Sequence, residues 1–427
     1  MAERFDVIVV GAGMAGNAAA YTLAKGGLKV LQIERGETPG SKNVQGAILY
    51  ADAIEKIIPD FRDDAPLERH LIEQRVWVMD DASYGYHYRS EDFNKPPYNR
   101  YTIIRVHFDQ WFNKKAREAG VLTICETRHD LLIEGGKVVG VRTDRQGGEV
   151  RADAVILADG VNSRLAVKAG FSRDQPENWA LAVKEIHFLP QETMEARFNI
   201  GEEEAAIEMA GKIDAGMMGT GFLYTNKESI TLGVGCMLSD FKQQKISPYE
   251  LLDRMKTHPS IAPLIAGSDM KEYAAHLIPE GGYNAIPQVY GDGWMIAGDA
   301  PIRHGIHREG SNLAMTTGML AAQTLVELRA ADKPFSAANL AEYKKKLDDS
   351  FVMKDLKKYR RMPEIFHKNK QFFTTYPDLL SRAAQTLIRV DGVDKKTKEK
   401  EIKKSFIGLR SLFGLIGDAF KFWRAVE

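Results

Sequence analysis

A short apolar strand that runs directly into a glycine-rich turn constrains the fold of this chain more than any other feature. Phe5–Val10 is β-branched and almost wholly apolar, which is typical of a strand buried on both faces of a parallel sheet. Residues 17–25 then carry a helical pattern, and a second apolar run, residues 29–33, ends at Glu34 and Arg35. The turn between strand and helix consists of Gly11, Ala12, Gly13, Met14, Ala15 and Gly16.

Each part of this unit suits the binding of a dinucleotide. Gly11 permits the tight turn, Gly13 lets a pyrophosphate approach the backbone, and Gly16 allows the helix to pack closely on the strand. The helix N-terminus offers free N–H groups to phosphates, and Glu34 stands where a carboxylate accepts hydrogen bonds from ribose hydroxyls. A glycine-rich turn without a ligand is disfavoured, because strand, helix, second strand and acidic residue all fall at the expected spacing.

Two later turns have the same character. The buried strand at residues 154–158 ends in Ala158, Asp159 and Gly160, and a strand near residue 295 ends in Gly298 and Asp299. Because parallel strands present their carboxyl ends at one edge of a sheet, we expect the three turns to meet at one site. A long ligand such as FAD would contact all three.

Further residues are predicted to contact this ligand. Gly310, Ser311 and Asn312 open a long helix over residues 313–329, whose N-terminus would face the flavin pyrimidine. The loop at residues 36–46 is either a ligand contact or an ordinary solvated loop. The remaining candidates, from that loop and from the start of a helix predicted over residues 106–120, are Lys42, Asn43, Gln45, Gly46 and Arg105.

Charge and cysteine usage limit the possible functions. The formal net charge is zero, which argues against a nucleic-acid partner. Residues 342–427 carry 21 lysines and arginines against 12 aspartates and glutamates, so the tail is basic. The two cysteines, Cys125 and Cys236, cannot build a disulfide framework, a metal site or an iron–sulfur cluster. No signal peptide and no run of about eighteen apolar residues is expected, which predicts an intracellular chain that is soluble or lies on a membrane surface.

The pattern of apolar and polar residues divides the chain into an α/β part, an inserted β part and a helical tail. We expect a Rossmann-like FAD-binding domain of glutathione-reductase type in three pieces, an inserted antiparallel sheet domain and a basic helical C-terminal region. The local predictions include a helix at residues 48–58, a strand at 196–200 and a single helix near 249–255 in the inserted domain. The predicted boundaries are 1–75, 101–175 and 284–332 for FAD binding, 76–100 for strands of the substrate domain, 176–283 for the inserted domain and 333–427 for the tail.

Several motifs resemble those of a known family. Arg105 before HFDQWF, the ADGVNS turn and the GDA turn resemble the FAD motifs of glutathione-reductase-type flavoproteins of the p-hydroxybenzoate hydroxylase fold. More narrowly, GSKNVQGAILY, GFLYTN, HPSIAPLIAG, HREGSNLAM and TYPDLL resemble FixC-type electron transfer flavoprotein–quinone oxidoreductases over nearly the whole chain.

This resemblance implies an FAD-containing subunit that takes electrons from an electron transfer flavoprotein with alpha and beta subunits (the FixAB-type pair). It would pass them to membrane quinone, at a site in the inserted domain against the membrane. Larger members end in a ferredoxin-like module with a four-iron cluster, for which this chain lacks cysteines. FixC-type systems supply this module as a separate small ferredoxin-like iron–sulfur subunit, so the resemblance implies such a partner. It also implies that this chain is cytoplasmic and peripheral on the inner face of the cytoplasmic membrane.

Electron transfer needs proximity and a tuned potential, so we nominate no nucleophile. His307 and Arg308, beside His304 and Glu309, are the polar groups expected near the isoalloxazine, where Arg308 would stabilise anionic reduced flavin and a histidine would relay protons. The alternative, loop residues satisfied by their neighbours, stays open.

The tail contains a candidate membrane-binding helix within residues 406–426. Its apolar residues recur at helical spacing with cations around them, as in helices that lie in a bilayer interface. A helix packed on the core or on a partner chain is the alternative. The apolar residues are Phe406, Leu409, Leu412, Phe413, Ile416, Phe420 and Trp423, and the cations are Lys403, Lys404, Arg410, Lys421 and Arg424.

Three other functions are weighed. Flavin hydroxylases, by resemblance, carry a proline-containing stretch between the Gly-Asp turn and the flavin-facing helix. Residues 303–312 occupy that place here and contain no proline, which disfavours a hydroxylase. A geranylgeranyl reductase is the enzymatic alternative, and a non-catalytic flavin-binding scaffold is the alternative from another class.

Overall fold

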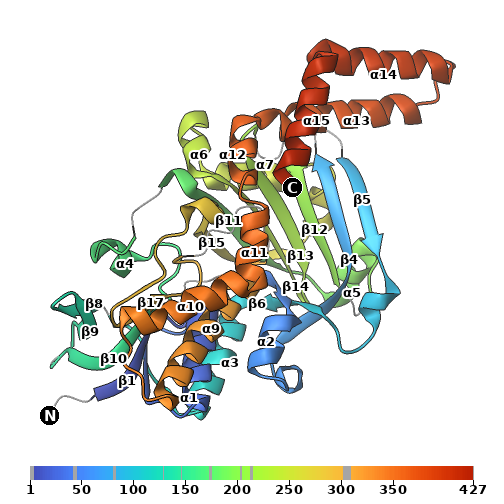
Figure 1. Ribbon diagram of the computed structural model, residues 1–427. Helices are drawn as coiled ribbons and strands as arrows, with labels where there is room; N and C mark the ends of the chain where they lie inside the picture. Colours follow the sequence, from blue (N-terminus) through green and yellow to red (C-terminus); the bar gives the residue numbers. More distant parts are fainter. Residues whose placement is uncertain are drawn as a thin grey trace. The chain divides into compact units, whose positions relative to one another are not determined.

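The computed structural model describes residues 4–41, 46–79, 83–127, 129–145, 147–172, 176–201, 204–211, 215–301 and 309–426. The chain forms two compact units, each built from three separate segments (Figure 1). The first unit consists of Met1–Glu68, Asn99–Gln175 and Leu277–Lys358. The second consists of Arg69–Tyr98, Pro176–His276 and Tyr359–Glu427.

The first unit is built on a parallel sheet in which β17, β10, β1, β2 and β7 are neighbours in that order. The strands are β1 (Arg4–Val10), β2 (Val30–Ile33), β7 (Leu122–Ile124), β10 (Glu149–Leu157) and β17 (Trp294–Ile296). Val10 lies opposite both Ile33 and Leu157, and Leu157 lies opposite Ile296. The four central strands therefore end at one level, as the sequence predicts.

Antiparallel strands extend this sheet. β16 (Tyr290–Gly291) pairs with β17, and the hairpin of β8 (His129–Glu134) and β9 (Lys137–Thr143) pairs with β10. Gly135 and Gly136 form the hairpin turn with φ angles of 56° and 84°, values that glycine adopts readily. This glycine pair therefore allows the tight turn between β8 and β9.

Helices α1 and α9 pack together at the glycine-rich end of the sheet. A Cβ added at Gly318 would lie 2.2 Å from the Ala15 carbonyl oxygen, so the helices touch backbone to backbone. The helices of this unit are α1 (Met14–Lys25), α2 (Ala51–Ile57), α3 (Arg105–Glu118), α4 (Arg164–Lys168), α9 (Gly310–Ala330), α10 (Ala337–Asp349) and α11 (Phe351–Lys358).

The helix predicted at residues 48–58 is only partly right. Gly46–Tyr50 forms strand β3, which pairs antiparallel with β6 (Arg100–Ile104), and the helix α2 starts at Ala51. The backbone hydrogen bonds of the first residues are taken by β6, so pairing with a distant strand overrides the local helical pattern.

The second unit is built on a mainly antiparallel sheet. β15, β11, β14, β13, β12 and β4 are neighbours in that order, β5 pairs with β4, and β12 runs parallel to β4. The strands are β4 (Leu67–Met79), β5 (Ser83–Arg89), β11 (Trp179–Phe188), β12 (Glu204–Gly211), β13 (Gly219–Thr225), β14 (Ser229–Met237) and β15 (Asp269–Pro279).

One face of this sheet is covered by helices. Leu223, Leu232 and Val234 are fully buried there with Leu251 and Met255 from α7. The expectation of one helix here is wrong, and the strand predicted at residues 196–200 lies largely in α5, since Met194 and Phe198 at i, i+4 both reach the core. The helices are α5 (Gln191–Phe198), α6 (Leu238–Gln244), α7 (Pro248–Thr257) and α8 (Ala262–Ile265).

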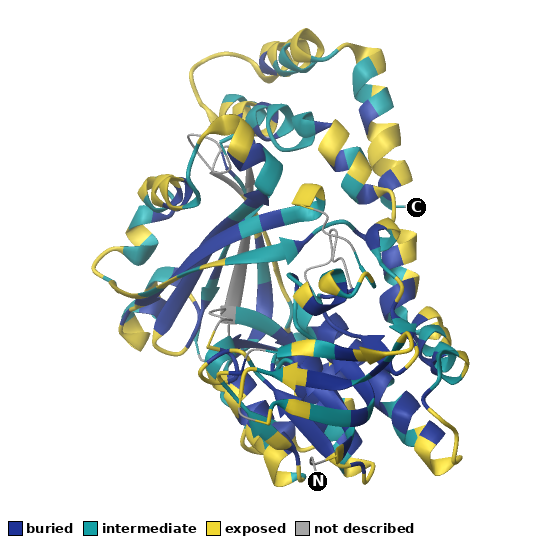
Figure 2. Cartoon of the chain, turned by 90° about the vertical axis from the view of Figure 1, so that its left-hand side faces the viewer, coloured by how far each residue is buried: buried dark blue, intermediate teal, exposed yellow. Residues whose placement is uncertain are grey.

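The tail of the chain is helical over its described length, as predicted. The segment expected to be one apolar helix is broken at Arg410, whose backbone is extended with φ −145° and ψ 126°. Buried residues dominate the sheets, whereas the helices near the C-terminus carry many exposed ones (Figure 2). Among the described residues, no helix is long and apolar enough to span a bilayer. The tail comprises α12 (Met362–Lys368), η6 (Lys370–Phe372), α13 (Thr375–Ile388), α14 (Lys395–Leu409) and α15 (Leu412–Val426).

Two glycine-to-alanine substitutions in helices should have opposite effects on stability. Gly318→Ala places a methyl group against the Ala15 carbonyl and should lower the free energy of unfolding by about 2 kcal/mol or more. Gly408→Ala meets no atom within 4 Å and should be neutral or stabilising by up to about 0.5 kcal/mol. Urea unfolding followed by circular dichroism measures both, and equal effects would contradict the close contact of α1 with α9.

Candidate active site

The glycine-rich turn brings β1 into backbone contact with the neighbouring strand. Gly11 has φ +102°, and a Cβ there would lie 2.2 Å from the Ala158 carbonyl oxygen. A Cβ at Gly16 would lie 2.0 Å from the Gly11 carbonyl oxygen, so any larger side chain would push the helix off the turn. The helix α1 begins at Met14 with no side-chain cap, which leaves its first N–H groups available to a ligand.

Glu34 follows β2 and lies beside this turn. One carboxylate oxygen accepts the Ala12 N–H at 2.9 Å and the other accepts the Gly36 N–H at 2.5 Å. Because a carboxylate has about four acceptor positions, it retains capacity for the hydroxyls of a ribose. Arg35, the next residue, is exposed.

A buried network of amide side chains supports the turn from below, and the sequence analysis missed it. Asn17 donates to the Ala12 carbonyl at 2.9 Å, and Gln32 donates to the Gly11 carbonyl at 3.1 Å and to Asn17 at 3.0 Å. Asn113 from α3 donates to the Gln32 side chain at 2.7 Å. The detectable signal was polar Gln32 inside the apolar strand β2 and polar Asn17 on an apolar helix.

Asp159 lies just beyond the end of β10 with a buried carboxyl. The Leu165 N–H donates to one oxygen at 3.3 Å, while Oδ1 has no hydrogen-bond partner in the described part of the chain. Burial raises the pKa of the Asp159 carboxyl to about 6, against the opposing effect of the Leu165 N–H. A buried acceptor without a donor indicates a missing partner, which the hydroxyls of a ligand would supply.

The third turn and the start of α9 complete the same edge of the sheet. The Gly298 N–H donates to the Thr317 hydroxyl at 2.9 Å, and Asp299 follows it. α9 begins at Gly310 and Ser311 without a side-chain cap. Asn312 in its first turn is buried, and its Oδ1 has no partner among the described residues. The fold thus brings all three predicted turns and this helix N-terminus into one unit.

The other predicted site residues fall into two groups. Arg105, at the start of α3, forms a two-point ion pair with buried Asp109 at 3.0 and 2.9 Å, and Gly46 opens β3. The remaining candidates lie outside the described residues: Lys42, Asn43, Gln45, His304, His307 and Arg308.

Three family models match residues 5–278 and 362–427 of the chain. Residues 5–178 match the model described as pyridine nucleotide-disulphide oxidoreductase, and residues 179–278 match ETF-QO, ubiquinone-binding. Residues 362–427 match the ETF-QO/FixC family C-terminal domain.

Full-length relatives decide the family. The chain is 61% identical to protein FixC of Bradyrhizobium diazoefficiens and 56% identical to protein FixC of Rhizobium meliloti, in each case over 99% of both chains. The chain belongs to the FixC family. It is also 39% identical, over 97% of its length and 96% of the relative's, to a probable electron transfer flavoprotein-quinone oxidoreductase of Escherichia coli. Membership of the FixC family makes the chain an FAD-dependent oxidoreductase, as the sequence predicted.

Solved structures share the fold. A geranylgeranyl bacteriochlorophyll reductase-like protein from Thermoplasma acidophilum has a TM-score of 0.72 at 21% identity, covering 95% of this chain and 97% of that one. The myxobacterial FAD-dependent halogenase CndH has a TM-score of 0.65 at 17% identity, covering 96% and 91%. The predicted α/β flavoprotein fold is confirmed for this FixC-family chain.

The residues at the strand ends fit FAD. The uncapped start of α1 and the glycine backbone would hold the pyrophosphate, Glu34 the adenosine ribose, and Asp159 or Asp299 the ribityl hydroxyls. The N-terminus of α9 would face the flavin ring, where its dipole favours negative charge. The bound flavin supplies the electron-transfer chemistry, and these residues only bind and orient it.

Asp159 should give the flavin-free protein a distinctive pH dependence. Because its folded-state pKa is raised, the stability that this group contributes is present below about pH 4 and is lost as pH rises through about 6, by on the order of 2–3 kcal/mol. Asp159→Asn should abolish this loss and also weaken FAD retention. Urea titrations at several pH values measure it, with exposed Asp144→Asn as the control, and an unchanged pH slope in Asp159→Asn would refute the assignment.

Proposed function

We propose that the chain receives electrons from a two-subunit electron transfer flavoprotein of the FixAB type and passes them through FAD to a membrane quinone. The observation that carries this proposal is the ubiquinone-binding family match at residues 179–278, in the same chain as the FAD site. The domain boundaries given from the sequence stay predictions, as do the roles of the individual site residues, including those of His307 and Arg308.

The second unit offers a surface suited to a quinone ring. Leu223 points into the core under the helices, so its neighbours Phe222 and Tyr224 point to the opposite face of the sheet. Their rings stack at 5.2 Å with an interplanar angle of 20°, and both are partly exposed. A Cβ at Gly233 would lie 2.4 Å from Phe222, so this ring lies close over the adjacent strand. Flat aromatic rings stack well on such a surface.

Partners are inferred from what the chain lacks. Cys125 is half-buried and Cys236 is buried in the other unit, and the described residues contain no cluster of metal-ligating side chains. Any iron–sulfur cluster on the path of the electrons would therefore belong to another chain, and a small ferredoxin-like subunit is proposed for this role.

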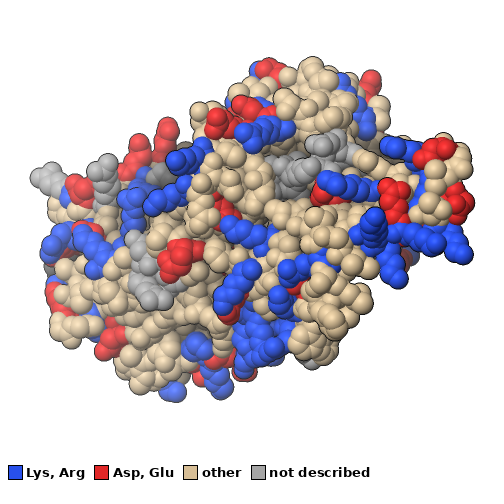
Figure 3. Space-filling model, turned by 90° about the horizontal axis from the view of Figure 1, so that it is seen from above, with Lys and Arg blue, Asp and Glu red and all other residues tan. Residues whose placement is uncertain are grey.

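A membrane surface is proposed at α15 and its neighbours. Leu412, Phe413, Ile416, Phe420 and Trp423 are each more than half exposed. Figure 3 views the molecule from above and shows many lysines and arginines, with aspartates and glutamates among them, next to uncharged surface. Exposed apolar side chains with exposed cations on the same and the preceding helix suit a bilayer interface with anionic lipid. This supports the proposal that the chain lies on the cytoplasmic face of the membrane. The exposed cations of α14 and α15 are Lys395, Lys396, Lys400, Lys403, Lys404, Lys421 and Arg424.

The direct test of this function is reoxidation by quinone. The holoprotein is photoreduced without oxygen, and a short-chain ubiquinone analogue is added while flavin absorbance is followed. Rapid reoxidation supports the proposal. Flavin that no quinone reoxidises would favour a scaffold role.

Phe222→Ala should impair the quinone step alone. Removing one ring of the stacked pair should slow quinone-dependent reoxidation roughly three- to tenfold through a weaker quinone affinity. FAD content and the rate of photoreduction should not change. Tyr249→Ala, which removes an exposed aromatic residue from α7 of the same unit, is the control. Equal behaviour of the two variants would contradict the proposed quinone surface.

Replacing two exposed aromatic residues of α15 should release the chain from lipid. Phe413→Ser with Phe420→Ser removes two large apolar groups from the proposed interface and should weaken binding to vesicles containing anionic lipid roughly tenfold or more. Ile133→Ser, at an exposed position on β8, is the control. If the double variant is fully retained in vesicle co-sedimentation, the membrane contact is not at α15 and would be assigned to the inserted domain.

A further inference from the structure

The apolar spacing of α15 suggests that its aromatic residues are buried, but the helix buries the side that carries Asp418 instead. Its only buried residues are Asp418 and Ala425. Its aromatic residues stay exposed, with Phe413 at 88%. An amphipathic helix in water normally buries its apolar stripe. The apolar contacts that α15 makes with α12 and η6 lie near its C-terminal end, at Phe422 and Ala425, so polar contacts must contribute to holding the helix.

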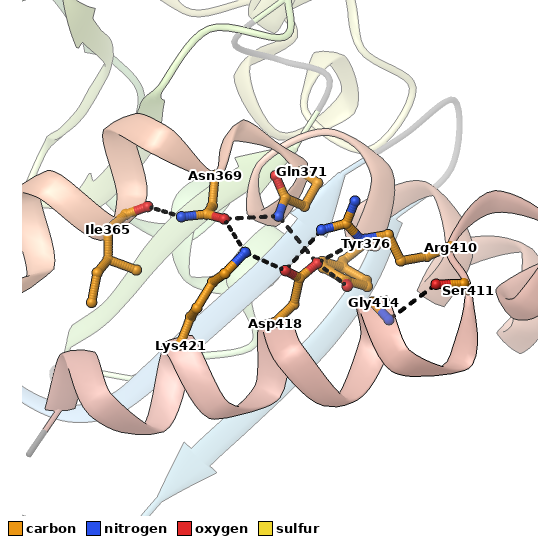
Figure 4. Close-up of polar contacts among 9 residues, drawn as sticks. All are labelled: Ile365, Asn369, Gln371, Tyr376, Arg410, Ser411, Gly414, Asp418 and Lys421. Atoms are coloured by element: carbon orange, nitrogen blue, oxygen red, sulfur yellow. Dashed lines mark hydrogen bonds and ion pairs between the residues drawn. The ribbon is translucent and has the colours of Figure 1, made fainter.

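A hydrogen-bonded cluster around Asp418 supplies that hold (Figure 4). Arg410 donates to both carboxylate oxygens, at 2.9 and 3.0 Å, and Lys421 donates at 3.1 Å. Tyr376 donates its hydroxyl at 2.8 Å and Gln371 its amide at 3.1 Å. The donors come from η6, α13, the break before α15 and α15 itself, so one carboxylate ties four segments together.

The charge of Asp418 is stable in this environment. Its side chain is 2% exposed, whereas those of Arg410 and Lys421 are 39% and 45% exposed. Burial alone would raise the pKa of this carboxyl, but the hydrogen bonds from Arg410, Tyr376, Gln371 and Lys421 outweigh it and hold the pKa far below its usual range. The carboxylate is therefore ionised at neutral pH, and its pairing with the Arg410 fork is directional.

A second set of contacts extends the cluster to α12. Lys421 also donates to the Asn369 side chain at 3.0 Å, and Asn369 donates to the Ile365 carbonyl at 2.7 Å. Further along α15, Ala425 packs with Met362 and Phe366 of α12. The edge of α15 that carries Asp418, Lys421, Phe422 and Ala425 thus lies against α12 and η6. Phe413, Phe420 and Trp423 remain exposed.

We propose that Asp418 is a positioning residue for membrane binding: it fixes α15 so that the aromatic face, rather than the polar face, is presented to lipid. The inference rests on the membrane surface proposed above. Without the carboxylate, Arg410 and Lys421 would turn to solvent, and α15 would be free to bury its own aromatic residues on the protein.

The test compares Asp418→Asn with Glu401→Gln in the full-length holoprotein. Both substitutions remove one negative charge, and Glu401 is exposed on the neighbouring helix α14. Simple electrostatics predicts that either variant binds anionic vesicles slightly better. The proposal predicts instead that Asp418→Asn binds vesicles of phosphatidylcholine with phosphatidylglycerol at least about fivefold more weakly, and that Glu401→Gln does not. Hydrogen exchange without vesicles should show faster exchange in α15 of Asp418→Asn only.

A second variant covers the case in which Asp418→Asn folds poorly. Arg410→Lys keeps every charge but loses the two-point pairing, so it should weaken vesicle binding to a smaller degree with no change in FAD content. Unchanged or tighter binding by Asp418→Asn with faster exchange in α15 would overturn the inference, because the helix would then be loosened without consequence for lipid. If the Phe413→Ser, Phe420→Ser variant also keeps its lipid binding, the membrane proposal itself fails. If that variant is released while Asp418→Asn stays bound, only the role of Asp418 fails.

Discussion

The contact between the Gly11 turn and the Ala158 carbonyl is the constraint on which the first unit depends. A Cβ at this position would lie 2.2 Å from the carbonyl oxygen, so the turns after β1 and β10 are joined backbone to backbone. With β2 and β17 in register beside them, the carboxyl ends of four strands share one edge. Two helix N-termini without side-chain caps start at this edge, from α1 and α9. Its buried acceptors include Asp159 Oδ1 and Asn312 Oδ1, which have no partner among the described residues. An extended, hydroxyl-rich dinucleotide matches this set of unsatisfied groups.

The sequence predicts this site from the residues of a few short turns. The glycines, Glu34 and Asp159 are predicted ligand contacts because of the pattern of single turns, and strand ends in a parallel sheet converge whatever connects them. The fold class followed from the same signals. What the sequence did not show depends on contacts between distant segments. Residues 48–50 pair with β6 instead of continuing a helix, and the amide network of Asn17, Gln32 and Asn113 forms only when α1, β2 and α3 meet.

The helical tail is the clearest case of a feature that depends on contacts between distant segments. Its apolar spacing left open whether the helix lies on a membrane or packs on the protein, and a lone aspartate in that pattern suggests a solvated position. Asp418 is buried because Tyr376 and Gln371, more than forty residues earlier, and Arg410 before the helix break donate to it. Polar contacts around Asp418 therefore act together with the packing of Phe422 and Ala425 to hold α15 while other aromatic residues of the helix stay exposed. In a FixC-family chain whose chemistry is carried by a cofactor, positioning of surfaces is the main task left to side chains.

The central claim is that one FAD occupies the edge where the strand ends meet. The most direct measurement is the visible absorption spectrum of the purified chain, together with the identity and amount of flavin released on denaturation. The account predicts the two visible bands of an oxidised flavin and about one FAD released per chain. A colourless protein that takes up no flavin from excess FAD would contradict it.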